Sequence, residues 1–206
     1  MMEILLVVMV VVLSLFAQGF LTANNLLSIL RSMAITGVVA FGMTMVIIGG
    51  EIDLSVGSTI ALSAVITAFV SNKMAELGVN PNFAVVIGIF VSLLVGALIG
   101  LFNGYIRTRY NIPSFITTLA MLNVLYGIAA VLSNGFPITI SSDWYSFIGA
   151  GQLFRRESFQ GIPVPGVWLV LVFIAVAIVM NKMRFGREVY AVGGNPESAR
   201  LSGINV

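Results

Sequence analysis

Long stretches without a charged residue dominate the pattern of polar and apolar positions along this chain. Six such intervals occur, and they are Ile4–Leu30, Ser32–Gly50, Leu54–Asn72, Leu77–Ile106, Tyr110–Ser142 and Ser158–Asn181. A helix needs about 20 apolar residues to cross the hydrocarbon core of a bilayer, and each interval is near or above that length. The intervals do not alternate polar and apolar residues, as the strands of membrane β-barrels do. We therefore predict six transmembrane helices, near residues 4–21, 33–49, 54–71, 83–103, 114–132 and 166–181.

The composition also indicates a membrane environment. Of the 206 residues, 59% are hydrophobic and only 9% are charged, whereas soluble domains carry about 25% charged residues. A soluble fold of this size could not bury so much apolar surface, so the solvent around it is lipid. The predicted fold class is an all-α membrane protein, a polytopic bundle of transmembrane helices that forms a single domain over residues 1–206.

Charge and residue usage exclude several kinds of function. The net charge is +2, from ten Lys and Arg against eight Asp and Glu, and the chain has no basic stripe that would bind nucleic acid. It contains no Cys and no His, which excludes disulfides, thiol catalysis and His-ligated metal sites. The first apolar segment lacks a basic start and an Ala-x-Ala cleavage site, so we interpret it as a retained anchor rather than a signal peptide.

The distribution of basic residues predicts the orientation in the membrane. If both termini are cytoplasmic, six Lys and Arg lie inside and four lie outside, in line with the positive-inside rule. The inside residues are Arg107, Arg109, Lys182, Arg184, Arg187 and Arg200, and the outside residues are Arg31, Lys73, Arg155 and Arg156. The longest connection, Ser133–Pro165, is then an irregular loop outside the membrane.

Small residues recur at every fourth position along the predicted helix at 83–103. They are Gly88, Ser92, Gly96, Gly100 and Gly104. Such a row lets two helix backbones approach closely in lipid, where van der Waals contact drives helix association. Gly is common in this chain, so chance is the alternative explanation, but five consecutive positions favour a packed contact between helices.

The segment Gly49–Ser58 separates two apolar runs and contains two acidic residues, Glu51 and Asp53. Acidic side chains at membrane depth are costly unless they are buried against partners or water, and interrupted helices line transport pathways. One interpretation is a broken helix beside a pathway, with Gly50, Glu51, Asp53 and Ser55 as candidate pathway residues. The other is a short cytoplasmic turn in which Asp53 or Ser55 caps the next helix. The segment holds no Lys or Arg, which slightly favours burial.

The C-terminal segment carries the signals of a short surface helix. Asn195 is a good N-cap, Pro196 fits the first helical position, and Glu197 complements the helix dipole. Gly203 can adopt the left-handed conformation that ends a helix. We predict a two-turn helix near residues 196–202, outside the bilayer. So short a helix is unstable alone, so it either docks onto a partner or is a fraying connector, and the residues leave both interpretations open.

Several motifs occur together in the order that one known family shows. Residues 25–63, which contain Gly42-Met43-Thr44 and the segment Gly49–Ser58, resemble the permease subunits of ABC importers for simple sugars of the ribose, xylose and galactose type. Glu51 is an extra acid relative to the usual Gly-Gly-Ile-Asp-Leu-Ser of this family. The runs Gly100–Gly104 and Pro113–Leu119 resemble the next signature, and Asn103 is a further candidate pathway residue.

The tail resembles the cytoplasmic loop of the same family. Its Glu-x-Ala and the Gly that follows also resemble the wider loop motif of importer permeases. The resemblance implies that residues 182–206 form a segment that couples to an ATPase, and the residues assigned to this coupling are Arg187, Gly193, Gly194, Asn195, Pro196, Glu197, Ala199 and Gly203. Family members continue beyond this loop with further helices, so we expect this chain to be an N-terminal portion, incomplete at its C-terminus.

The resemblance implies a function and a set of partners. The chain would be the multi-pass permease subunit of an importer in a bacterial cytoplasmic (inner) membrane, specific for a monosaccharide. A second permease subunit would complete the pathway, ATPase subunits would drive it, and a periplasmic sugar-binding protein would deliver the substrate. The chain lacks the Gly-x-x-x-x-Gly-Lys-Ser motif that holds ATP phosphates. We therefore expect it to be no enzyme and to bind no cofactor, with ATP used by the partner.

Three other functions remain open at this stage. The first is a branched-chain amino-acid permease from a related family, against which the motif at Gly49–Ser55 argues. The second is a structural or non-functional truncated membrane fragment. The third is an intramembrane enzyme, which is disfavoured because His and Cys are absent and because the neighbouring Glu51 and Asp53 need not converge as an acid–base pair.

Overall fold

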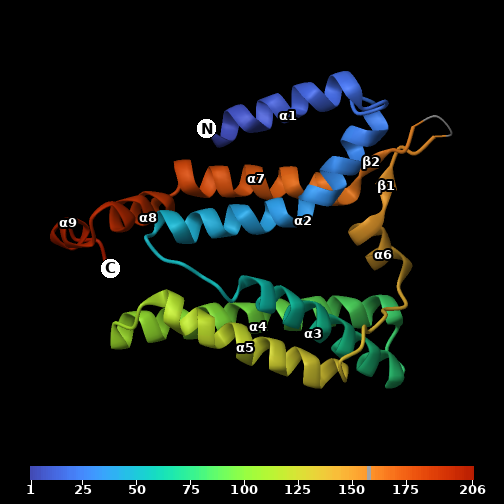
Figure 1. The fold of residues 1–206 in the computed structure, drawn as a ribbon. Coiled ribbons are helices and arrows are strands. Elements are labelled where there is room, and N and C mark those ends of the chain that lie inside the picture. Colours follow the sequence, from blue (N-terminus) through green and yellow to red (C-terminus); the bar gives the residue numbers. More distant parts are fainter. Residues whose placement is uncertain (157–158) are drawn as a thin grey trace. The chain divides into compact units, whose positions relative to one another are not determined.

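Helices make up nearly all of the regular structure. The computed structural model describes residues 1–156 and 159–206 (Figure 1). The helices are α1 (Met2–Phe16), α2 (Ala23–Ile48), α3 (Val56–Glu76), α4 (Pro81–Tyr110), α5 (Ser114–Ser133), α6 (Asp143–Ala150), α7 (Val164–Lys182), α8 (Arg184–Gly194) and α9 (Pro196–Leu201). Two short strands, β1 (Gln152–Leu153) and β2 (Ile162–Pro163), pair antiparallel. The predicted all-α class is confirmed.

The apolar helices correspond to the predicted spans. Within the described ranges, five helices are long and apolar enough to cross a membrane, namely α2, α3, α4, α5 and α7. The first helix, α1, is equally apolar but has 15 residues, fewer than the roughly 20 that a span needs. It ends at Phe16 rather than near residue 21, and Gly19, with φ +82°, turns the chain just beyond it.

Two predicted boundaries differ from the structure. The second helix begins at Ala23 rather than near residue 33, so Arg31 lies within α2 and its placement in a loop was wrong. A single long basic side chain can reach from a helix toward the membrane surface, so it need not end the helix. The connection Ser133–Pro165, predicted as irregular, contains α6 and both strands. Ser158, the first residue of the last charge-free interval, lies outside the described residues.

The chain forms two compact units, of which the first comprises Met1–Ala40 and Ser146–Ala175. In this unit α2 and α7 pack through small residues. A Cβ atom on Gly37 would overlap the side chain of Leu169, and a Cβ on Gly166 would lie 2.8 Å from Cδ2 of Leu30. Each glycine thus makes room for a leucine side chain of the other helix, and small residues of this kind are enriched at helix contacts in lipid.

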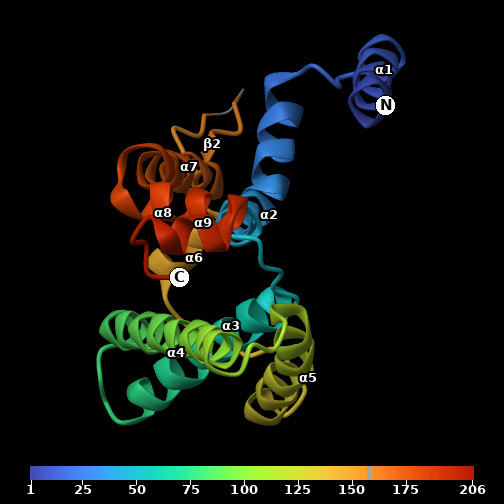
Figure 2. The same cartoon turned by 90° about the vertical axis from the view of Figure 1, so that its left-hand side faces the viewer.

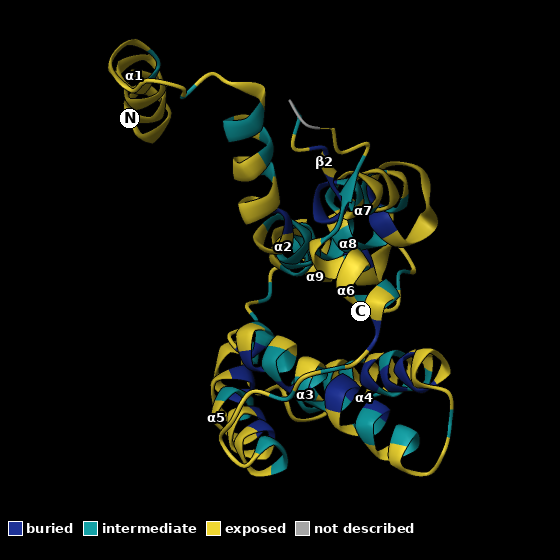
Figure 3. Ribbon diagram, turned by 90° about the vertical axis from the view of Figure 1, so that its right-hand side faces the viewer, coloured by how far each residue is buried: buried dark blue, intermediate teal, exposed yellow. Residues whose placement is uncertain are grey.

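The second unit comprises Phe41–Tyr145 and Val176–Val206. Its core is a three-helix bundle in which α3 packs against both α4 and α5 (Figure 1). Leu62, Leu125 and Ala129 form the buried apolar cluster between these helices. The outward faces of the bundle are largely exposed (Figure 3). The exposed side chains include large apolar ones such as Leu93, Leu98 and Phe102, as expected where lipid replaces water as the solvent.

The row of small residues on α4 is packed only in its first half. A Cβ atom on Gly88 would lie 2.5 Å from both the Thr67 carbonyl oxygen and Ser71 Oγ, so α3 and α4 meet there, and Ser92 is also buried. At Gly96, Gly100 and Gly104 an added Cβ would meet no atom of a neighbouring element within 4 Å in the part of the chain that the structure describes. A packing role for these three glycines therefore stays a prediction, and it requires a helix from outside the described residues.

Candidate functional site

Residues 49–55, between the end of α2 and the start of α3, are not helical. We call this segment the helix break. Helix α2 ends with the pair of hydrogen bonds typical of a Schellman motif. The Glu51 N–H donates to the Val46 carbonyl (3.1 Å) and the Gly50 N–H donates to the Ile47 carbonyl (3.0 Å). Gly50 has φ +82°, a conformation that glycine adopts without steric cost. The chain then runs without regular structure to Ser55, the N-cap of α3. Because α2 and α3 are each long enough to cross a membrane on their own, this backbone agrees with either interpretation of Gly49–Ser58, and both stay predictions.

Hydroxyl groups of α5 bind the backbone of this helix break. The Ile52 N–H donates to Ser114 Oγ and the Leu54 N–H donates to Thr118 Oγ1, each at 3.1 Å. Thr118 is buried, and its hydroxyl donates to the Ser114 carbonyl at 2.8 Å. A broken helix in a membrane protein leaves backbone groups without helical partners, and side chains of neighbouring helices must satisfy them. The first turn of α5 has this role here.

The two acidic side chains of the break have different partners. Glu51 Oε1 lies 2.7 Å from Arg107 Nε of α4, and both side chains are about one-third exposed, at 34% and 39%. Asp53 Oδ1 instead accepts hydrogen bonds from the Ser55 N–H (2.7 Å) and the Ser55 hydroxyl (2.6 Å). Ser55 itself is fully buried. Asp53 thus binds Ser55, the N-cap residue of α3, but neither side chain accepts a hydrogen bond from the first turn of that helix. Glu51 ties the break to α4.

Asn103, the remaining candidate pathway residue, lies on α4 one turn before Arg107. Its Oδ1 atom is buried and has no hydrogen-bond partner among the residues that the structure describes, and the same holds for Thr117 Oγ1 on α5. Buried polar atoms without partners are uncommon in folded proteins. No described contact joins Asn103 to the break, so its part in a pathway stays a prediction.

The tail forms the predicted helix and a second one before it (Figure 2). At the start of α9 the Asn195 side chain accepts a hydrogen bond from the Ser198 N–H at 3.0 Å, and Pro196 occupies the first turn. Gly203 has φ +82° just beyond the helix, and Ala199 is buried. Each local signal read from residues 195–203 is therefore present as predicted. Glu197, Arg187 and Gly194 are exposed.

The helix α8 was not predicted, because it is short and its glycines interrupt the spacing of apolar residues that marks a helix face. An apolar residue recurs at Phe185, Val189 and Val192, the spacing of one helix face. The charged residues Arg184 and Glu188, which pair at 2.6 Å, lie on its exposed side. The helix can begin so soon after α7 because Gly186 lies against the backbone of Met180, where no side chain would fit.

The same helix brings the tail to the helix break. A Cβ atom on Gly193 would overlap the carbonyl oxygen of Ile48 and lie 3.2 Å from Gly49 Cα. A Cβ on Gly50 would lie 3.9 Å from Gly193 Cα, and one on Gly49 would lie 3.8 Å from Val189 Cγ1. Two groups of residues singled out separately in the sequence, the break and the coupling segment, thus meet backbone to backbone.

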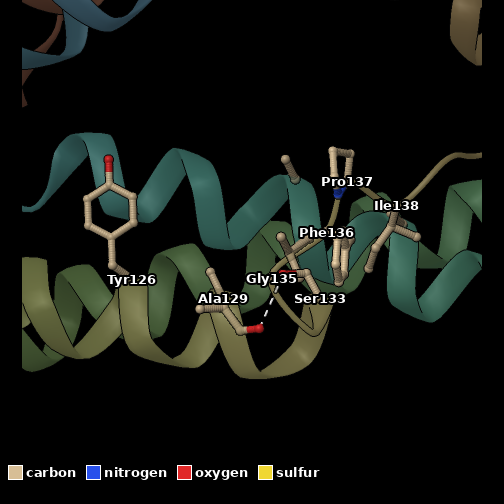
Figure 4. Close-up of a pocket in the computed structure, with 11 residues that line it drawn as sticks. Tyr126, Ala129, Ser133, Gly135, Phe136, Pro137 and Ile138 are labelled. Atoms are coloured by element: carbon tan, nitrogen blue, oxygen red, sulfur yellow. Dashed lines mark hydrogen bonds between the residues drawn. The ribbon is translucent and has the colours of Figure 1, made fainter.

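A hollow of about 490 Å³ lies beside the bundle, between α3 and α5, and the residues after α5 close one end of it (Figure 4). It is lined by alanines of both helices and by Tyr126, Ser133, Phe136 and Pro137. The Ser133 hydroxyl is already bonded to the Ala130 carbonyl at 3.3 Å. With few polar groups on its walls, the hollow is a weaker candidate site than the helix break.

Comparison with known protein families assigns the chain to one of them. The family described as branched-chain amino acid transport system / permease component matches residues 25–206. The chain belongs to this permease family. The matched range includes the helix break and both tail helices. The chain is therefore a multi-pass transmembrane subunit similar to bacterial permeases, and it is not a catalytic one.

Individual relatives confirm the resemblance to sugar-importer permeases. The chain is 41% identical over 201 residues to the ribose import permease protein RbsC of Bacillus subtilis. It is 38% identical over 195 residues to the L-arabinose ABC transporter permease protein AraH of Azospirillum brasilense. It is 34% identical over 204 residues to the D-allose transport system permease protein AlsC of Escherichia coli. These matches cover 98%, 94% and 98% of the chain.

The chain spans 59%, 53% and 58% of the length of these three relatives. No solved structure matches the chain.

Proposed function

We propose that the chain is the membrane-spanning permease component of an ABC importer for a monosaccharide. The observation that carries the proposal is the similarity of nearly the whole chain to permeases named for ribose, L-arabinose and D-allose. The break at Gly49–Ser55 and the tail at 182–206 both lie within the matched segments. The five long apolar helices supply the transmembrane scaffold that such a subunit requires.

The proposal includes partners outside this chain. A separate ATPase subunit binds and hydrolyses ATP, a second permease subunit completes the pathway, and a periplasmic sugar-binding protein delivers the substrate. The assembly lies in the bacterial cytoplasmic membrane. The surface offered to the ATPase is the exposed side of the tail, where Glu197 and Arg187 present opposite charges and Leu201 is almost fully exposed. Charged residues on the rim of an interface favour selective pairing with one partner.

In this function the permease contributes two alternative packings of its helices rather than chemistry. Binding of the ATPase and of the loaded binding protein shifts the population between them. Broken helices near a pathway are suited to such a shift, because a few residues change conformation while the helices on both sides stay intact. The helix break, with its glycines and hydroxyl partners, is the candidate position for that change.

A second candidate substrate is a branched-chain amino acid, because the description of the matching family names it. Deleting the gene from its host and measuring uptake of labelled ribose, arabinose, allose and leucine separates the two. We expect uptake of at least one of the sugars to be lost and to return with a plasmid copy of the gene. Unchanged uptake of all three sugars, together with loss of leucine uptake, would favour the amino-acid permease instead.

A further inference from the structure

The contact between α8 and the end of α2 is made by backbone atoms. Gly193 lies against the carbonyl of Ile48 and the Cα of Gly49, with no room for a Cβ atom. Val189, one turn earlier on α8, lies against Gly49 as well. These residues are partly buried, and a contact between two backbones has no side-chain rotamers that could absorb a displacement. A movement of α8 is therefore passed directly to residues 48–50.

Beyond this contact the break is attached to the three-helix bundle. Glu51 pairs with Arg107 of α4 at 2.7 Å. The next backbone groups bind α5, through Ile52 to Ser114 and through Leu54 to Thr118. Between Ile48 and Leu54 the chain passes from a contact with α8 to an ion pair with α4 and hydrogen bonds with α5. Both kinds of attachment can exchange partners, since an ion pair and hydroxyl groups reorient more easily than a packed apolar core.

We propose that Gly193 is a positioning residue that transmits the movement of α8 to the helix break during transport. In this account α8, Ile48 and Gly49 move together. The resulting displacement of Glu51 and Ile52 changes their contacts with α4 and α5. The inference rests on the proposed function, because it assumes that an ATPase moves the tail. It extends that function by naming where the movement enters the membrane-spanning part of the permease.

Replacing Gly193 by Ala tests this proposal in the complete importer, reconstituted with its ATPase and binding protein. The added methyl group overlaps the Ile48 carbonyl, so α8 must shift away from the break. We expect stimulation of ATP hydrolysis by the loaded binding protein, and sugar uptake, to fall about tenfold or more. The amount of inserted permease and the co-purification of the ATPase should stay as in the unmodified importer. The matched control is Gly127→Ala on α5, where an added Cβ meets no atom within 4 Å. Equal stimulation in both variants would overturn the proposal.

A crosslink gives a second test that does not depend on how well the Ala variant folds. Residues 1–206 contain no Cys, so Gly49→Cys and Val189→Cys introduce the only two within them, and any Cys elsewhere in the importer is replaced by Ser first. If α8 and the end of α2 move as one body, oxidising this pair leaves stimulated ATP hydrolysis and uptake unchanged. If the two segments separate in the cycle, the crosslink blocks both, and the proposal is wrong. Failure of the unmodified importer to take up any of the three sugars would refute the proposed function instead, while ATP hydrolysis with and without the crosslink still decides the role of this contact.

Discussion

At the scale of single residues, the ion pair between Glu51 and Arg107 is the only charged link between the helix break and α4 among the described residues. We expect Glu51→Gln to lower uptake by a few fold, because it releases the break from α4 while leaving the backbone hydrogen bonds to α5 intact. The side chains are partly exposed, so the loss of stability should be small. Uptake in membrane vesicles and thermal unfolding in detergent measure the two effects.

The control for this prediction is the exchanged pair, Glu51→Arg with Arg107→Glu. If the attraction itself matters, the double variant recovers a large part of the uptake that either single variant loses, as coupled residues do in a double-mutant cycle. Additive losses in the double variant would show that the pair has no role in transport.

Asp53 tests the local structure of the break. Its Oδ1 atom accepts two hydrogen bonds from Ser55, and an amide oxygen can accept the same two. We therefore expect Asp53→Asn to keep normal uptake and stability, and Asp53→Ala to lower stability by about 1 kcal/mol, the typical net value of a hydrogen bond. Uptake and thermal unfolding of both variants are the measurements. Strongly reduced uptake in Asp53→Asn at normal protein level would instead favour a buried pathway carboxylate.

Residue-level signals could be read from the sequence where they are local. The cap by Asn195, the positive φ of Gly203 and the link between Asp53 and Ser55 involve neighbours within three positions, so they follow from residue type. The partner of Glu51 could not be predicted, because Arg107 lies 56 residues later. The absence of a nearby basic residue favoured burial of the segment, whereas the Glu51 side chain is one-third exposed.

At the scale of helices, Gly88 of α4 lies in a close contact with Thr67 and Ser71 of α3. We expect Gly88→Leu to reduce the amount of folded permease, because the side chain would overlap the Thr67 carbonyl and the Ser71 hydroxyl. Overpacking of this kind costs about 1–3 kcal/mol. Size-exclusion chromatography and the melting temperature in detergent measure the loss. The control is Gly127→Leu on α5, where an added Cβ would meet no atom of the described residues within 4 Å, and an equal loss there would contradict the assignment.

The apolar helices could be predicted because lipid imposes a length and a composition on every span. Their ends were less certain, as Arg31 shows: a single charge does not end a helix when no Gly or Pro accompanies it. The helix α8 was missed because it lies outside the apolar segments and is marked only by Phe185, Val189 and Val192. Its contact with the break depends on Gly193, whose role becomes visible only when Ile48 is placed against it.

At the scale of the whole molecule, the orientation in the membrane is a further prediction. The helix break lies beside Arg107 and beside α8, so basic residues of two separate segments gather at one end of the second unit. The positive-inside rule places that end in the cytoplasm. We expect a Cys at Ala150 to react with a membrane-impermeant maleimide added outside the cell. A Cys at Gly194 should react only after the membrane is permeabilised. The reverse pattern of labelling would contradict this orientation.

The central claim is that the chain carries monosaccharides when it is assembled with its partners. The most direct measurement is uptake by proteoliposomes that hold the complete importer, with ATP supplied to the ATPase side and the binding protein on the other. We predict ATP-dependent accumulation of labelled ribose, arabinose or allose, and no accumulation of leucine. Accumulation of leucine without any of the sugars, or sugar entry that does not depend on ATP, would contradict the account.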